Sequence, residues 1–125
     1  MSTEVLTTDK EISDAKFLTD FRLMEVMKFV IANNINKVAD EKTFCLSIGY
    51  TSPRNLQLIN KGTQHFKISH ISNACAVYKI NADFLLNKNC HKMFADPSNE
   101  TPIFRLKVAA AEVEIYLKEL EEGLI

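Results

Sequence analysis

The sequence predicts an all-α fold. Two segments, residues 17–33 and 103–123, carry apolar side chains at intervals of three and four, which places those side chains along one side of a helix. The segments between them begin at capping residues and end near glycine or asparagine, as short helices do. The alternation of apolar and polar residues typical of strands is not found in the sequence.

The first helix is predicted over residues 17–33. Its inward face is formed by apolar residues at helical spacing, namely Phe17, Phe21, Met24, Met27 and Ile31. Asn33 and Asn34 are expected to end this helix, because asparagine tolerates the left-handed conformation. Residues 1–15 are polar and aperiodic, and we expect a flexible tail there.

Two short helices with a glycine turn between them come next. One is predicted over residues 41–48, with Asp40 as its cap, and the other over residues 53–61, with Ser52 as its cap. Gly49 between them can take the positive φ that a tight turn requires. Two such helices within a small helical domain form the helix-turn-helix pattern.

Three further segments complete the predicted organisation. One helix is expected over residues 69–78, and a short one follows Asn81, which can cap it. Residues 95–102, rich in turn formers, are predicted to be a linker. The final helix, within residues 103–125, is rich in Ala, Glu, Leu and Lys.

The composition excludes several classes of protein. The odd number of cysteines (Cys45, Cys75 and Cys90) and their spacing indicate neither a disulfide framework nor a zinc site, and we expect a cytoplasmic protein with inert thiols. His65 and His70 do not form a helical metal pair, and Cys90-His91 has no partners. No secretory signal, membrane span, cofactor, small-molecule ligand, metal or catalytic site is predicted, so the chain is not expected to be an enzyme.

The charges are unevenly distributed along the chain, although the net charge is only −1. Residues 43–82 contain no Asp or Glu, but they contain the basic residues Arg54, Lys61, Lys67 and Lys79. This segment is expected to give the protein a positive side that suits an anionic partner. The alternative is an ordinary solvated surface.

The helix predicted over residues 53–61 has two different faces. At about 100° per residue, Leu56 and Ile59 share one side. Arg54, Gln57 and Lys61 share the opposite one, with Leu58 beside them. In a major groove, arginine pairs with guanine, glutamine pairs with adenine, and an apolar side chain touches the thymine methyl. The alternative is a polar face that only contacts water.

The stretches "IGYTSPRNLQLINKG" and "INADFLLNK" resemble the lambda-repressor-like helix-turn-helix family of phage repressors and related bacterial regulators. The resemblance covers residues 17–94, and it implies a DNA-binding domain over residues 16–94. It also implies five packed helices, with residues 53–61 as the recognition helix.

Matched by position, the resemblance implies that Arg54 and Gln57 read bases. Because the turn is one residue longer than in the family, Asn55 and Leu58 are included as base readers. The implied phosphate contacts are Ser52, Lys61, Thr63, Gln64, His65 and Lys67. Glu41 departs from the family, which usually has a phosphate-binding glutamine there.

The last helix carries a heptad pattern of apolar residues. This seam consists of Ile103, Leu106, Ala110, Val113, Leu117, Leu120 and Leu124. Such spacing predicts pairing with a second helix, so residues 103–125 are interpreted as a dimerisation helix. The alternative is a helix that folds back on its own domain, which Val108 and Ile115 favour because they widen the apolar surface.

Together these patterns predict a homodimeric, sequence-specific binder of double-stranded DNA. A dimer is expected because one recognition helix alone covers too few base pairs. The protein would be a prokaryotic or phage transcription regulator, and more readily a repressor than an activator. The alternative is a helical protein-interaction module, such as an antitoxin or an adaptor, whose last helix binds another protein.

Overall fold

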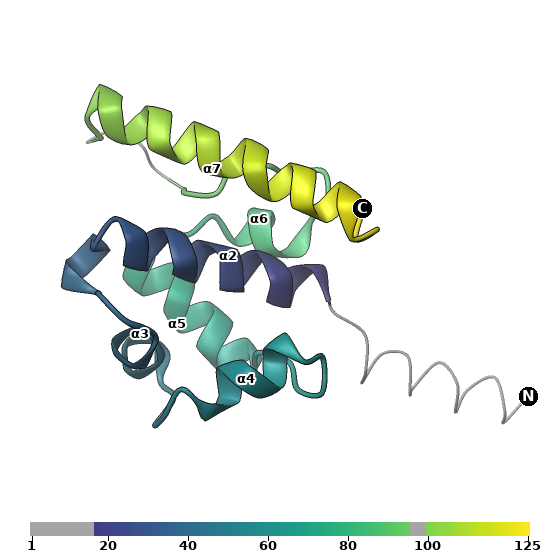
Figure 1. Cartoon of the computed structure of the whole chain (residues 1–125). Coiled ribbons are helices and arrows are strands. Elements are labelled where there is room, and N and C mark those ends of the chain that lie inside the picture. The colour runs from purple at the N-terminus through teal and green to yellow at the C-terminus, as the bar shows by residue number, and fades with distance from the viewer. Residues whose placement is uncertain (1–16, 96–99) are drawn as a thin grey trace, which may run out of the picture.

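The computed structural model describes residues 17–95 and 100–125, and this part of the chain is all-helical (Figure 1). Its elements are α2 (Leu18–Ala32), the 3₁₀ helix η1 (Ile35–Lys37), α3 (Glu41–Ile48), α4 (Arg54–Asn60), α5 (Ile68–Tyr78), α6 (Ala82–Leu86) and α7 (Pro102–Glu121). No strand forms in these ranges, where Ile80 and Phe94 make one isolated bridge. The all-α prediction is confirmed.

The helix boundaries follow the local signals in the sequence. The carboxylate of Asp40 accepts the backbone N–H of Thr43 at 2.7 Å and caps α3, and Asn81 likewise caps α6. Asn34 takes a φ of 51° after α2, as predicted. Pro102 lies inside the first turn of α7, so the final helix begins one residue earlier than expected.

Some predicted segments fall outside this description. The tail over residues 1–15 lies outside the described residues, and so do residues 96–99 of the predicted linker. The division of the chain into a domain over residues 16–94 and a separate segment over residues 103–125 stays a prediction. As shown below, however, α7 packs against the rest of the chain.

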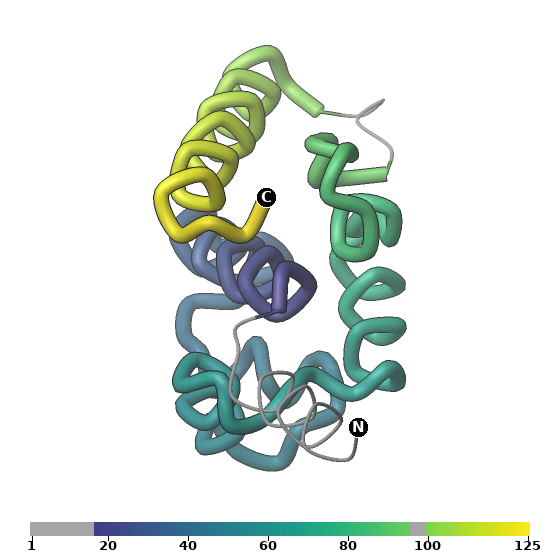
Figure 2. The backbone as a smooth tube through the Cα atoms, turned by 90° about the vertical axis from the view of Figure 1, so that its right-hand side faces the viewer, coloured from purple at the N-terminus to yellow at the C-terminus, as the bar shows by residue number. Residues whose placement is uncertain are grey.

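The centre of the fold is α2, which contacts α3, α4, α6 and α7. Figure 1 places α7 and α4 on opposite sides of α2, and Figure 2 shows α5 and α6 along a third side. Because α2 is packed on several sides, its buried set is wider than the predicted face: Asp20, Arg22, Leu23, Glu25, Val26, Met27, Phe29 and Val30. Phe17, Phe21, Met24 and Ile31, expected inside, are only half-buried.

A buried ion pair joins α2 to α7. Arg22 and Glu119 are both fully buried, and Arg22 Nε donates to Glu119 Oε2 at 2.6 Å. The same guanidinium donates to the backbone oxygen of Phe84 in α6 and to those of Asn87, Lys88 and Cys90 after it. Since a buried guanidinium has five donors to satisfy, this arrangement fixes α2, α6 and α7 relative to one another.

The last helix folds back on its own domain, but it does so with the face opposite to the predicted seam. Val108, Ile115 and Glu119 are the buried residues of α7. On a helical projection, the seam is centred about 180° away from them. The seam is therefore exposed, with exposed fractions of 69% for Ile103, 71% for Leu106, 60% for Val113, 52% for Leu117 and 49% for Leu120.

One predicted seam residue departs from this pattern. Leu124 lies beyond the end of α7 and is half-buried. Gly123, with a φ of 69°, turns the chain before it, and the backbone N–H of Leu124 donates to the backbone oxygen of Glu119 at 2.9 Å. Leu124 therefore does not continue the exposed apolar stripe.

Candidate nucleic-acid interface

The inward faces of α3 and α4 belong to the common apolar core of the fold, in which α3 packs mainly on α5 and also on α2, and α4 packs on α2. Phe44, Cys45 and Ile48 of α3 are buried, as are Leu56 and Ile59 of α4. Cys45, four residues before the turn glycine, is fully buried.

The turn itself is clamped by α5. Gly49 has a φ of 107°, and a Cβ atom there would lie 3.2 Å from the side chains of Asn73 and His70. Glycine is therefore required both by conformation and by space. Asn73 Nδ2 donates to the backbone oxygen of Ile48 at 2.9 Å, which fixes the end of α3. The end of α3 and the turn are therefore held in place by α5.

The outer face of α4 is polar. Arg54, Gln57 and Lys61 are exposed, on the side of the helix away from the buried Leu56 and Ile59. Because Leu56 and Ile59 face inward where α4 packs on α2, the three polar side chains point away from the body of the protein. This is the face that the sequence predicted.

The other predicted base readers are less accessible. Asn55 and Leu58 are half-buried. The side-chain oxygen of Asn55 accepts Nε2 of Gln64 at 3.0 Å. The helix begins at Arg54, one residue later than predicted, and its N-cap residue is Pro53 rather than Ser52. Ser52 Oγ is 3.4 Å from the backbone nitrogen of Arg54, a contact too long for the predicted cap. Arg54 and Gln57 are therefore better placed than Asn55 and Leu58 to reach a ligand.

The loop over residues 63–67 is divided between outward and inward side chains. Thr63 and Lys67 are exposed, whereas Gln64 and His65 are half-buried. His65 stacks on Phe17, with ring centroids 3.8 Å apart. Of the predicted phosphate contacts, Lys61, Thr63 and Lys67 point outward.

Asp20 at the start of α2 positions this loop, and sequence reasoning missed its role. Its carboxylate lies 2.5 Å from Nδ1 of His65 and accepts the backbone N–H of Phe66 at 3.0 Å. An acidic residue in the first turn of a helix also suits the helix dipole. The sequence alone therefore gave no signal that Asp20 holds a distant loop.

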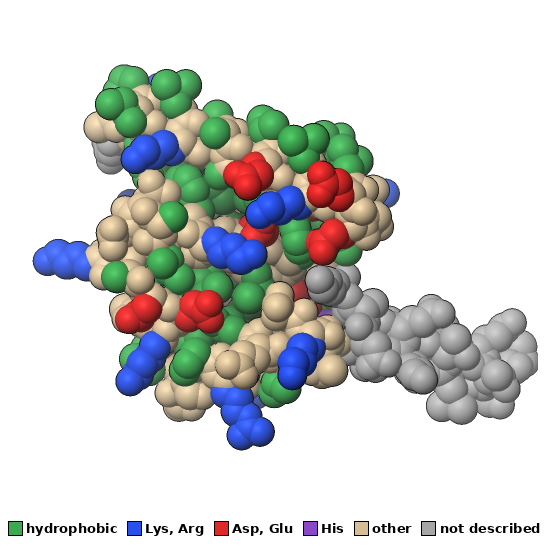
Figure 3. All heavy atoms as spheres, in the orientation of Figure 1, with side chains coloured by type: hydrophobic (Ala, Val, Ile, Leu, Met, Phe, Trp, Pro, Cys, Tyr) green, Lys and Arg blue, Asp and Glu red, His purple; other side chains and the backbone are tan. Residues whose placement is uncertain are grey.

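The lower edge of the surface in Figure 3 is rich in basic side chains, and the upper edge is rich in hydrophobic ones. Several Lys and Arg side chains project along this lower edge, around α3 and α4, and others lie over the middle of the face and near α7, where Asp and Glu side chains lie as well. The basic side chains of α4 and the loop after it are Arg54, Lys61 and Lys67, from the segment without acids. A polyanion would approach this lower edge most favourably.

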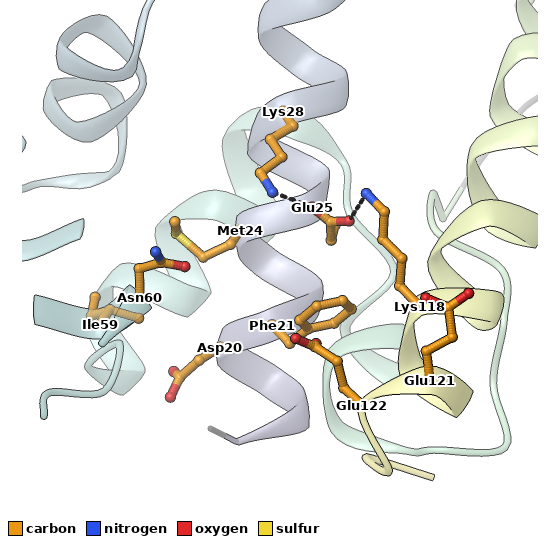
Figure 4. Close-up of a pocket in the computed structure, with 10 residues that line it drawn as sticks. All are labelled: Asp20, Phe21, Met24, Glu25, Lys28, Ile59, Asn60, Lys118, Glu121 and Glu122. Atoms are coloured by element: carbon orange, nitrogen blue, oxygen red, sulfur yellow. Dashed lines mark hydrogen bonds and ion pairs between the residues drawn. The ribbon is translucent and has the colours of Figure 1, made fainter. Parts of the chain in front are cut away.

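A pocket of about 280 Å³ lies between α2, the end of α4 and the end of α7 (Figure 4). Figure 4 shows Lys28 and Lys118 both pointing at Glu25. Nζ of Lys28 lies 2.8 Å from Oε2 of Glu25, and Nζ of Lys118 lies 2.7 Å from Oε1. Both ammonium groups thus already have a carboxylate partner. The contacts indicate a structural connection between α2 and α7 more than a binding site.

The chemistry of the thiols and of other candidate sites is limited. Burial raises the pKa of Cys45 to about 11, so this thiol is poorly suited to act as a nucleophile. Nowhere in residues 17–95 and 100–125 do three His, Cys, Asp or Glu side chains gather as metal ligands would. A membrane span needs about 20 consecutive apolar residues, and none of the described helices offers one.

Comparisons with protein-family models, with curated proteins and with solved structures gave no match.

Proposed function

We propose that the chain binds double-stranded DNA through the outward face of α4. One observation carries this proposal: Arg54, Gln57 and Lys61 stand exposed together on the outer face of α4, a short helix that packs on α2 and follows the glycine turn after α3. Arginine and glutamine are the side chains that make bidentate contacts to guanine and adenine. The unit of α3, turn and α4 would then act as a helix-turn-helix, with α4 as its recognition helix.

The surroundings of α4 support the same proposal. Lys61 at the end of α4 and Lys67 after the following loop are exposed cations beside the proposed base readers. Phosphate contacts from such lysines supply most of the affinity of DNA-binding proteins. The lambda-repressor-like arrangement of five helices is proposed for α2 to α6, with α7 as an addition to it.

We propose that the active species is a homodimer and that it regulates transcription, more readily as a repressor. A single α4 covers few base pairs, so specific binding by one copy would be weak. The exposed seam of α7 offers an apolar surface that a second copy could cover.

A second function is favoured by that same surface. The exposed apolar face of α7 would also suit a different protein, as in an antitoxin or an adaptor. Under this alternative α4 would be an ordinary solvated helix. The two proposals differ in whether the protein binds a duplex at all.

Duplex selection from a random pool tests the proposed function. We expect enrichment of one sequence, and binding to it that weakens steeply as the salt concentration rises. The matched comparison is a scrambled duplex of equal length. Equal binding of both duplexes would contradict base reading, and no binding to either would favour the protein-interaction alternative.

A further inference from the structure

The final helix is apolar on two opposite sides. One side, with Val108 and Ile115, is buried against the domain, and the other presents the large residues Ile103, Leu106, Val113, Leu117 and Leu120 to the surface. A contiguous apolar stripe on the surface of a helix normally packs against another surface. The outer side of α7 therefore lacks a covering surface in a single copy.

We infer that α7 of a second copy covers this side, and that the two helices run antiparallel. In this orientation each large seam residue packs against a large residue of the partner, and the small Ala110 packs against a medium-sized one. Ile103 lies opposite the partner's Leu120, Leu106 opposite the partner's Leu117, and Ala110 opposite the partner's Val113. Two-fold symmetry repeats each layer, so all six seam residues of α7 are used.

The charges beside the seam favour the antiparallel orientation. Lys107 and Glu114 lie on the same edge of α7, both are exposed, and the register above brings Lys107 next to the partner's Glu114. Symmetry makes this attraction occur twice. On the other edge, Ala109 meets the partner's Tyr116, which lets a large ring lie over a small residue.

A parallel pair would lose these contacts. In parallel helices the residues of one edge lie beside those of the opposite edge of the partner. Lys107 would then face Pro102 or Ala109, and Glu114 would face Ala109 or Tyr116. No attraction between opposite charges would result along the seam, so the sequence of α7 is matched to the antiparallel arrangement.

The antiparallel pair has a consequence that rests on the proposed function of α4. The outward face of α4 and the outward face of α7 point away from α2 in opposite directions (Figure 1). Pairing through α7 therefore leaves the two α4 faces at opposite ends of the dimer. Such a dimer would hold two separate duplex segments together, rather than bind two half-sites one helical turn apart.

Charge reversal tests the pairing, with the full chain and analytical ultracentrifugation. Lys107→Glu and Glu114→Lys should each weaken dimerisation about tenfold, because each converts two attractions into repulsions. The double variant should recover most of the loss. Lys37→Glu, an equal change of charge outside α7, should have no effect. A monomeric wild-type chain, or single variants without mutual rescue, would overturn the antiparallel pairing.

Bridging is tested separately with the selected duplex in an immobilised form and a fluorescent form. The wild-type protein should capture the fluorescent duplex on the immobilised one, and Leu117→Glu should abolish capture while each duplex is still bound. Binding of both duplexes without capture by a dimeric protein would overturn bridging and leave the function of α4 intact. Absence of any duplex binding would instead contradict the proposed function, and charge reversal would still decide the pairing.

Discussion

The outward faces of α4 and α7 differ in chemistry although both helices pack on α2. The face of α4 presents Arg54, Gln57 and Lys61, whereas that of α7 presents leucine, isoleucine and valine. A polar face is stable in water and requires no partner, so its function must be inferred from the kind of side chains it carries. An exposed apolar stripe is itself unfavourable in water, and this argues for a partner more directly.

Arg22 joins α7 to α2 and α6, and its loss should have the largest effect. Arg22→Met leaves Glu119 buried without its partner and several backbone oxygens without a donor. We expect a loss of about 3–5 kcal/mol in the free energy of unfolding, measured with urea. The double variant Arg22→Met/Glu119→Leu should recover part of it. If Arg22→Met were as stable as the wild type, α7 would not depend on this pair.

Leu117→Glu should affect the face of α7 alone. Each leucine buried in the dimer contributes roughly 1.5–3 kcal/mol, and the substitution replaces two of them with carboxylates in an apolar strip. We expect the dissociation constant of the dimer, measured by light scattering, to rise at least about 100-fold, while the circular dichroism spectrum stays unchanged. The control is Leu86→Glu on α6, where a leucine that is also exposed (70%, against 52% for Leu117) lies outside the seam. Unfolding of Leu117→Glu would show that this residue belongs to the core.

Substitutions on the face of α4 should separate base reading from phosphate binding. Arg54→Ala and Gln57→Ala should each cost about 1–3 kcal/mol on the selected duplex and little on a scrambled one. Lys61→Ala should weaken binding to both duplexes alike. It should also lower the steepness of the plot of log affinity against log salt concentration by about 1. Fluorescence anisotropy at several salt concentrations measures both quantities. Equal losses on both duplexes for Arg54→Ala would remove it from the base readers.

The smallest expected effect depends on pH and concerns Glu25, between α2 and α7. Burial raises its pKa, but hydrogen bonds and charges from Lys118 and Lys28 outweigh burial, so the pKa lies below the usual 4.5. Its stabilisation is therefore present above pH 4.5 and is lost as the pH falls through the lowered pKa.

Lys118 shows the opposite behaviour. The hydrogen bond to Glu25 raises the pKa of Lys118 above 10.5, so its share of the stabilisation holds below pH 10.5 and is lost at higher pH. We expect Glu25→Gln to lower the free energy of unfolding, measured with urea, by about 1 kcal/mol at pH 7. Well below pH 4.5 the variant and the wild type should be equally stable. A difference that does not change with pH would argue against the ion pairs.

The sequence predicted the features of the fold that depend on local chemistry. Asp40, Gly49 and Asn81 act through their immediate neighbours, so the helix limits they set were within reach of pattern reasoning. The polar face of α4 followed from helical spacing in the same way. Helix spacing also located the stripe on α7, although the chain turns away before Leu124.

Features that depend on distant contacts could not be predicted. The spacing in α2 indicates one buried face, whereas four helices surround it and bury Arg22 and Glu25 as well. The partner of Arg22 is 97 residues away, and that of Asp20 is 45 residues away. Nothing in the local sequence distinguishes these charged residues from those of an ordinary solvated helix.

The most direct test of the difference between the two faces is an NMR titration of the labelled protein with the selected duplex. We expect the amide signals of α4 and of residues 63–67 to shift, while those of the exposed stripe of α7 stay in place. Dilution without DNA should move the signals of α7 and leave α4 unchanged. Shifts that DNA causes mainly along α7, or dilution shifts confined to α4, would contradict the assignment of DNA to one face and a second copy to the other.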